Sequence, residues 1–134
     1  MEDFALPITA LCAALLGALM AFMTTSLALY RRRKLVSYGD GGDGQFAKRL
    51  RGQGNAVEQI PISLILLGFA EATQNPVAVI WLIAALMVTG RFLHAWQFWN
   101  RGGIFFFRPL GVALTLAGQA TAIIAILFAL FLAG

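Results

Sequence analysis

Three polar side chains with helical spacing are the residues of this sequence best placed for chemistry. Arg51, Asn55 and Glu58 follow one another at intervals of four and three residues. At about 100° per residue they fall within about 60° of one another on a helix, so they form one polar stripe. Such a stripe either binds a charged ligand or holds helices together, and the spacing alone leaves both interpretations open.

A second polar set follows further along the chain. Arg91 and His94 share a helix face with Phe98 and Arg101 at intervals of three, four and three residues. Arg91 is expected at a depth similar to that of Glu58, so the two predict an ion pair within one chain or across a subunit boundary. A lone histidine such as His94 is more often a packing residue than a catalytic base.

The composition of the sequence excludes several other kinds of site. His94 and Cys12 are the single histidine and the single cysteine, they fall on different predicted helices, and they have no metal-ligand partners. Cys12 lies in an apolar run, where a thiol stays protonated and inert, and it cannot form an intramolecular disulfide. Neither a phosphate-binding glycine loop nor a nucleophile elbow is present. We therefore expect no metal centre.

The elements that position these side chains are predicted to be four membrane-spanning helices. The chain has 134 residues, of which 60% are hydrophobic and only 12% charged, too few charges to cover a soluble domain. One span takes roughly 20 apolar residues, so four spans use nearly the whole chain. The predicted fold is a single all-α membrane domain, a four-helix bundle in the lipid bilayer. Its spans cover about residues 5–30, 46–71, 76–100 and 109–132, with a cytoplasmic loop at about 31–45.

The second span is the unusual one. Its purely apolar stretch, residues 60–70, is about half of what a span needs. The helix must therefore begin near Phe46 and carry Glu58 into the hydrocarbon region, with Pro61 as a site for a kink. A charge near the bilayer centre costs roughly 2.5–3.5 kcal/mol, so charged residues kept there usually have a function.

Proline marks the predicted starts of the last two spans. Asn75 and Pro76 predict a cap followed by the first helical residue, and Arg108 and Pro109 predict the same for the fourth span.

The distribution of basic residues predicts the topology. All ten Lys and Arg lie between Arg31 and Arg108, and nine of them fall in two segments, residues 31–51 and 101–108, that are predicted near one membrane face. By the positive-inside rule, residues 31–51 and 101–108 face the cytoplasm, while both termini and the turn at 71–75 face away. A nucleic-acid partner is disfavoured, because the charges are arranged by membrane side.

These motifs together resemble those of the MAPEG family, membrane-associated proteins in eicosanoid and glutathione metabolism. The stretch from Arg51 through Asn55 and Glu58 resembles the family signature Arg-x3-Asn-x2-Glu, usually followed by proline as here. Residues 90–94 resemble the third-helix Gly-Arg-x-x-His of its prostaglandin E synthase and bacterial branches. Arg108 resembles the thiol-activating arginine of the fourth helix. The similarity covers the whole chain and is closest to a bacterial-type member, which implies the bacterial inner membrane.

The resemblance implies a homotrimer that binds glutathione between neighbouring subunits, near the cytoplasmic face. It assigns carboxylate contacts to Arg51 and one arginine of Arg31–Arg33, amide contacts to Gln53 and Asn55, and the γ-glutamyl end to Glu58. Arg31 is favoured over its neighbours because it precedes Arg51 by twenty residues. The full implied glutathione set is Arg31, Arg51, Gln53, Asn55, Glu58, Arg91 and His94, with Arg108 as the catalytic residue.

The implied activity is that of a glutathione-dependent transferase or peroxidase. Arg108 would stabilise the glutathione thiolate for attack on a lipophilic electrophile arriving from the bilayer. Where better-known members place tyrosines, this chain has Phe98, Val112 and Gln59. These replacements argue against an eicosanoid-specific activity and for modest catalysis. Conjugation, peroxide reduction and isomerisation all use the same thiolate, so the sequence does not separate them.

Two other functions compete with this interpretation. One is a family member that binds glutathione or acts as a scaffold without catalysis. The other is a small multidrug exporter, which has an essential glutamate in its first helix, whereas residues 5–30 contain none. The aromatic residues Trp96, Trp99 and 105–107 are better explained by an interfacial belt than by a substrate pocket.

Overall fold

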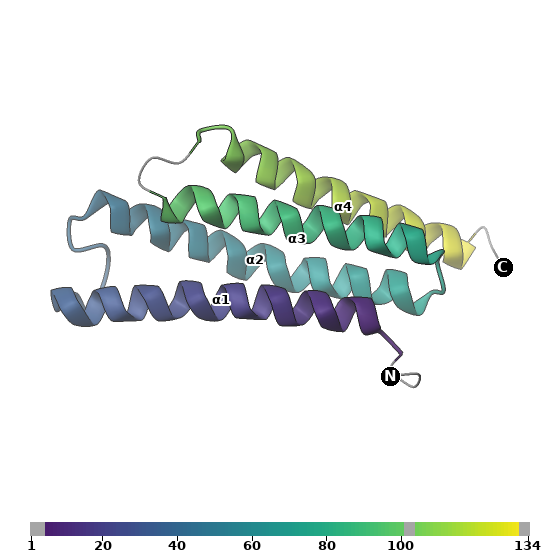
Figure 1. The fold of residues 1–134 in the computed structure, drawn as a ribbon, viewed down its shortest axis with the longest axis horizontal. Coiled ribbons are helices and arrows are strands. Elements are labelled where there is room, and N and C mark those ends of the chain that lie inside the picture. Colours follow the sequence, from purple (N-terminus) through teal and green to yellow (C-terminus); the bar gives the residue numbers. More distant parts are fainter. Residues whose placement is uncertain (1–4, 101–103, 132–134) are drawn as a thin grey trace.

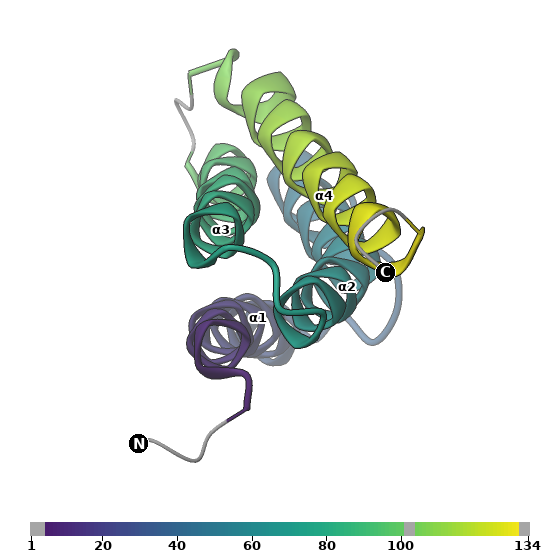
Figure 2. The same ribbon diagram turned by 90° about the vertical axis from the view of Figure 1, so that its right-hand side faces the viewer.

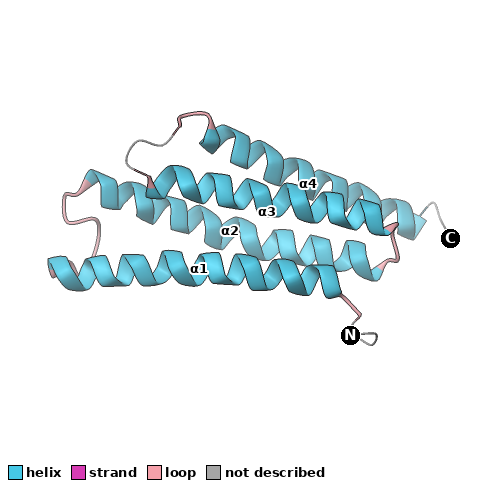
Figure 3. Ribbon diagram, viewed as in Figure 1, coloured by secondary structure: helices cyan, strands magenta, loops and turns pink. Residues whose placement is uncertain are grey.

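The chain folds as four α-helices and, within the described residues, no strands, as predicted. The computed structural model describes residues 5–100 and 104–131. The helices are α1 (Pro7–Lys34), α2 (Gly44–Ala72), α3 (Val77–Trp99) and α4 (Phe107–Phe131) (Figures 1 and 3). Arg101, which was predicted to share a face with Arg91, lies outside the described residues.

The four helices run alternately up and down the bundle. The start of α1 and the end of α4 lie at the same end of the molecule (Figure 1). Viewed along the bundle, α2 and α3 lie between α1 and α4 (Figure 2), and no contact joins α1 to α4 in the described part of the chain. The predicted site residues of α2, α3 and α4 therefore belong to helices that touch one another.

Three of the helices have the length and hydropathy of membrane spans. These are α1, α3 and α4, whereas α2 falls outside the same criteria of length and composition. The polar first half of α2 accounts for the difference, because it carries Arg51, Asn55 and Glu58 on the same continuous helix as the apolar second half. This helix begins at Gly44, two residues before the predicted start, and continues through Pro61.

Two predicted helix starts were wrong. Pro76, not Asn75, is the N-cap of α3 and makes no side-chain cap bond. The Asn75 side-chain nitrogen instead donates to the carbonyl oxygen of Ala70 at 2.9 Å, so it closes the end of the preceding helix. Because α4 already begins at Phe107, Pro109 is its third residue rather than its first.

The first helix is longer than the apolar run that predicted it. It continues past Tyr30 through the four basic residues to Lys34 and ends where Leu35 adopts a left-handed conformation with φ 54°. Helix formation therefore extends beyond the hydrophobic segment, because a helix in water at a membrane edge still satisfies its own backbone hydrogen bonds.

Asp43 begins α2 as its N-cap and also binds α1. One carboxylate oxygen accepts from the backbone nitrogens of Gln45 at 2.9 Å and Phe46 at 3.0 Å. The other accepts from the hydroxyl of Tyr30, whose ring stacks on Phe46 with centroids 4.0 Å apart. The hydrogen bond from Tyr30, followed by those from the backbone, holds the pKa of Asp43 below its usual range. This contact fixes α1 and α2 together at their basic ends.

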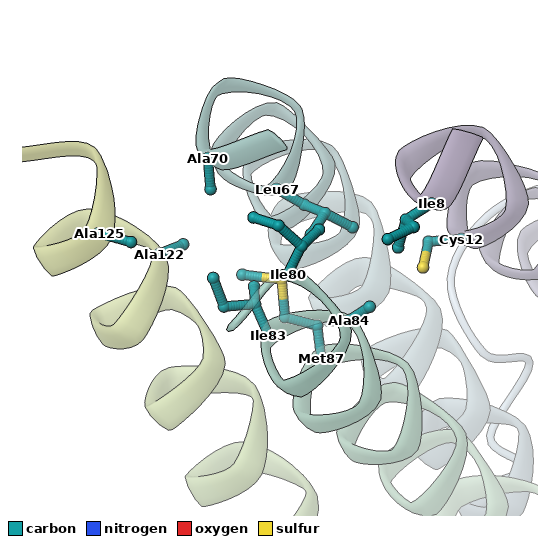
Figure 4. Close-up of a cluster of buried hydrophobic side chains, with 10 residues drawn as sticks. All are labelled: Ile8, Cys12, Leu67, Ala70, Ile80, Ile83, Ala84, Met87, Ala122 and Ala125. Carbon is teal, nitrogen blue, oxygen red and sulfur yellow. The ribbon is translucent and has the colours of Figure 1, made fainter. Parts of the chain in front are cut away.

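A buried apolar cluster joins all four helices at the opposite end. Its members are Ile8, Cys12, Leu67, Ala70, Ile80, Ile83, Ala84, Met87, Ala122 and Ala125 (Figure 4). Packed methyl and methylene groups at this end hold the bundle together, which leaves the other end for polar side chains.

Glu71 caps the first turn of α1 from the end of α2. Its carboxylate accepts from the backbone nitrogens of Ile8 at 3.0 Å and Thr9 at 2.8 Å, and from the Thr9 hydroxyl at 2.6 Å. The residue that precedes α1, Leu6, offers no side-chain cap. Glu71 thus satisfies amides that a helix leaves without intrahelical partners, and its charge lies near the positive end of the helix dipole.

Replacing Glu71 by alanine is expected to destabilise the protein by about 1–3 kcal/mol, because two backbone amides and a hydroxyl lose their acceptor. The measurement is thermal unfolding in detergent. Glu58→Ala is the matched control, since it removes an exposed carboxylate from the same helix. Equal unfolding temperatures for the two variants would contradict a stabilising role for Glu71.

Glycines allow α3 and α4 to approach closely. A Cβ atom placed on Gly111 would lie 2.7 Å from the carbonyl oxygen of Gly90 and 2.8 Å from the backbone nitrogen of His94. A Cβ atom on Gly90 would in turn lie 2.7 Å from the carbonyl oxygen of Gly111. Small residues at a membrane-helix interface permit such backbone contact. The close approach sets the position of the α4 residues around Gly111, including Arg108 and Thr115.

Candidate functional site

The stripe predicted on α2 lies on a face of that helix that the chain leaves open. Arg51 and Glu58 are exposed and Asn55 is half-buried. The same face continues along the helix as an apolar surface, on which Ile65 is 53% and Phe69 61% exposed. One half of this face therefore suits a charged ligand, and the other half suits lipid or another protein surface.

Arg91 connects three helices from a buried position. It is 3% exposed, and its Nη1 donates to Asn55 Oδ1 at 2.8 Å while its Nε donates to Thr115 Oγ1 at 2.9 Å. The Thr115 hydroxyl donates in turn to the Gly111 carbonyl oxygen at 2.8 Å. Since the Asn55 oxygen accepts from Arg91, the amide orientation is fixed and its Nδ2 is left to donate elsewhere.

The ion pair predicted between Glu58 and Arg91 does not form within the described chain. Arg91 bonds neutral oxygens instead, and Glu58 is exposed on the open face of α2. Depth along a helix does not fix rotation about its axis, and the rotation here turns Arg91 toward Asn55. The pairing across a subunit boundary stays a prediction.

Phe98 brings Arg108 next to the polar half of α2. The guanidinium carbon of Arg108 lies 5.6 Å from the centre of the Phe98 ring. The same ring packs against Gly52, where a Cβ atom would lie 2.7 Å from Phe98 Cγ. His94 is 3% exposed and packs its ring 4.8 Å from Phe98. The Phe98 ring therefore lies between Arg108, which is exposed, and the turn of α2 that contains Gly52 and Arg51.

Arg31 and Gln53 lie on the other side of α2. The guanidinium carbon of Arg31 is 5.2 Å from the centre of the Phe46 ring, and its Nη1 is buried without a hydrogen-bond partner among the described residues. Gln53 is half-buried and lies about 200° around α2 from Arg51, on the side that faces α1. A single chain does not bring Arg31 and Gln53 together with Arg51 and Arg108.

A polar hollow of about 610 Å³ lies beside Arg51, between α2 and the loop that precedes it. Asp40, Lys48 and Arg51 supply its charged lining, with Gly39 and Gly44 among its other residues. Asp40 and Lys48 were not selected from the sequence as site residues. Asp40 lies in the loop before α2, whereas Lys48 precedes Arg51 by three residues and Asn55 by seven, and so lies on the same face of the helix as the stripe. The hollow gives the polar half of α2 access from the side of the basic loop.

Several supporting residues were also missed. Thr115 holds Arg91, and Gln119 donates to Gln59 Oε1 at 3.1 Å and to Ser63 Oγ at 3.0 Å, so α4 carries a polar edge facing α2. The signal was present, because Thr115 and Gln119 are four residues apart in a mostly apolar helix and therefore lie on one face.

The open side of the site offers two arginine cations, a carboxylate and a free amide donor. No three His, Cys, Asp or Glu side chains come together as metal ligands in the part that the structure describes. This donor set suits a small molecule with carboxylates, an ammonium group and amides. It contains no side-chain nucleophile, so any nucleophile for chemistry must come from the ligand.

Comparison with known proteins adds a family and two relatives. The model of the MAPEG family matches residues 9–133. The inner membrane protein YecN of Escherichia coli K12 is 31% identical over 108 residues, which cover 81% of this chain and 81% of that protein. YecN of Escherichia coli O6:H1 is similar to the same extent.

Proposed function

This chain is a membrane protein of the MAPEG family, and from that premise we propose that it binds glutathione and activates its thiol toward lipophilic electrophiles. The substrate would reach the site from the bilayer. The protein would work as a homotrimer in the bacterial inner membrane, with its glutathione site near the cytoplasmic face and both termini on the other side.

The observation that carries the proposal is the open face of α2 with Arg51, Asn55 and Glu58, together with Arg108 of α4, which Phe98 places beside Gly52 of the same helix. Glutathione has two carboxylates, one ammonium group, two amides and a thiol. Arg51 suits a carboxylate through charge-assisted hydrogen bonds, and Glu58 suits the ammonium group. The free Nδ2 of Asn55 suits an amide oxygen. One carboxylate and the ammonium group thus each have an accessible partner of opposite sign on this face, and one amide oxygen has a hydrogen-bond donor.

The division of the predicted residues between two sides of α2 supports a site between subunits. Arg51 and Arg108 lie toward α4, whereas Arg31 and Gln53 lie toward α1. A molecule of the size of glutathione can contact both sets of residues only where two copies of the chain meet. The exposed apolar half of α2 offers the surface for that contact.

Arg108 is the residue proposed to activate the thiol. A free thiol has a pKa of about 8.5, and a nearby guanidinium lowers it by favouring the thiolate. When bound, glutathione supplies the sulfur nucleophile that the chain itself lacks. Packing against Phe98 restricts the Arg108 side chain, so that the positive charge is in place before the substrate arrives.

Arg91 and His94 are proposed to position other residues rather than to touch glutathione. Both are 3% exposed within the chain. Arg91 orients the amide of Asn55, and His94 supports the ring of Phe98 from the α4 side.

One observation favours a second function, glutathione binding without catalysis. The ring beside Arg108 is Phe98, which has no hydroxyl to donate to a thiolate. A protein with this site could hold glutathione and yet conjugate it slowly. The two functions share the binding residues and differ in turnover.

Replacing Arg51 by glutamine is expected to weaken glutathione binding by about tenfold to a hundredfold, the loss of one charge-assisted hydrogen bond. Isothermal titration calorimetry of the purified protein in detergent measures the change. Arg32→Gln removes an exposed arginine from α1 and is the control.

Conjugation of glutathione to a halonitrobenzene separates the proposed functions. Binding with conjugate formation supports the transferase, and binding without it supports the second function. Failure of the parent protein to bind glutathione would overturn both.

A further inference from the structure

A long apolar groove runs between α1 and α3. Its volume is about 530 Å³, and its lining includes Leu15, Ala18 and Phe22 of α1 with Phe92, Trp96 and Trp99 of α3. The one polar residue of the lining is Asn100, at the end of α3. Both helices have the length and hydropathy of membrane spans, so the groove opens toward the hydrocarbon of the bilayer.

At the end of the groove near the basic loop, Trp99 is held by hydrogen bonds from two directions. Trp99 donates from its indole nitrogen to Ser26 Oγ at 3.2 Å, and its ring lies 6.0 Å from that of Phe22. Arg49 donates from Nη2 to the Trp99 carbonyl oxygen at 3.4 Å and places its guanidinium carbon 5.9 Å from the Trp99 ring. The apolar groove therefore has a cation at the end where the basic loop lies.

A second cation lies on the same face of α1. Arg33 follows Leu15 by eighteen residues, or about five helical turns, so the two point the same way. Arg33 is exposed and lies about 16 Å along α1 from Phe22. That distance is within the roughly 20 Å that one leaflet occupies with its headgroups.

We propose that this groove is a binding site for an anionic phospholipid. One acyl chain lies between α1 and α3 along Leu15 and Phe22, and the phosphate lies between Arg33 and Arg49. The apolar lining excludes a water-soluble ligand, and the two cations at one end favour a negative headgroup over a zwitterionic one.

The groove is separate from the glutathione site, so this inference does not depend on the proposed function. Phe98 faces Gly52 and Arg108, whereas its neighbour Trp99 faces Ser26 of α1. A molecule in the groove thus lies on a different side of α3 from Arg108 of the same chain. For this reason we assign the groove to a structural lipid and not to the electrophilic substrate.

Quenching of tryptophan fluorescence by brominated lipids tests the proposal. The Trp81→Phe variant leaves Trp96 and Trp99, both in the groove lining, as reporters. We expect phosphatidylglycerol brominated on its acyl chains to exchange into the groove with about tenfold higher affinity than brominated phosphatidylcholine, as two nearby arginines predict. Inorganic phosphate at millimolar concentration should not relieve the quenching.

Matched variants locate the site. Ala18→Leu fills the groove and should reduce quenching, whereas Ala21→Leu changes an exposed alanine outside the lining and should not. Arg33→Gln combined with Arg49→Gln should abolish the preference for the anionic lipid, and Arg32→Gln should keep it. Circular dichroism and gel filtration establish that each variant is folded. Arg33→Gln alone, at an exposed position, replaces the double variant if the latter unfolds.

Four results would overturn the proposal. Equal quenching by the two lipids would show no headgroup selection. Equal quenching in Ala18→Leu and Ala21→Leu would place the lipid elsewhere. Weak quenching by both lipids, together with disulfide crosslinking between copies at Ala18→Cys, would show that a second chain fills the groove. Relief by inorganic phosphate would indicate a site for a soluble anion.

Discussion

Replacing Arg108 by alanine is expected to lower conjugation turnover by roughly a hundredfold while leaving glutathione affinity nearly unchanged. Loss of one group that stabilises charge at a reacting atom usually has an effect of about this size. The reason lies in its position. Arg108 is on α4, held by the ring of Phe98, whereas the carboxylate, ammonium and amide partners proposed for glutathione lie on α2. Its charge therefore acts on the thiol rather than on the rest of the ligand.

Steady-state kinetics with a halonitrobenzene, together with calorimetry, separates the two effects. The pH profile adds a second readout, because loss of the guanidinium should shift the rise in turnover to higher pH as the bound thiol regains its ordinary pKa. Arg32→Ala is the control for a general loss of positive charge. Equal turnover in Arg108→Ala and the parent would remove Arg108 from the mechanism.

Replacing Gly111 by alanine is expected to destabilise the bundle by about 1–3 kcal/mol or more, the usual cost of forcing extra atoms into a packed interface. The new Cβ atom would lie 2.7 Å from one backbone oxygen and 2.8 Å from a backbone nitrogen of α3. Backbone cannot move aside as a side chain can, so α3 and α4 must separate. The same separation should displace Thr115 from Arg91, so glutathione binding should fall as well.

Thermal unfolding in detergent measures the first effect and calorimetry the second. Gly17→Ala is the matched control, because no other helix of the chain comes within 4 Å of the position where its Cβ would be. There the substitution should be neutral or stabilise the helix by about 0.5–1 kcal/mol. If both variants unfold at the same temperature, the α3–α4 contact is not as close as the structure has it.

Hydropathy was sufficient to predict α1, α3 and α4, because each contains a long apolar run. The second helix was predicted only because its short apolar stretch had to be extended back through polar residues to reach the length of a span. Helix ends were harder to predict. Asn75 and Arg108 precede prolines in a pattern typical of helix starts, yet Asn75 bonds backward to Ala70 and α4 begins one residue before Arg108. Local capping preferences of about 1 kcal/mol are easily outweighed by packing between helices.

Helical periodicity located the stripe on α2 but not the partners of its members. Arg51 and Glu58 share one face of α2, as a rotation of about 100° per residue requires, and both are exposed there. The contact of Arg91 with Asn55 depends on how α3 is rotated, and that rotation follows from the fit of Gly90 against Gly111. Such a fit between backbones has no signature in the spacing of polar residues.

The carboxylate of Glu71 has a consequence for how the protein is made. The ribosome delivers Ile8 and Thr9 more than sixty residues before the side chain that binds their amides. The first helix can therefore form early, but the amides of its first turn gain these bonds only after the end of α2 has been synthesised and has packed beside it. The pair α1 and α2 is thus the smallest fragment of the nascent chain in which the first turn of α1 has the carboxylate that accepts from its amides.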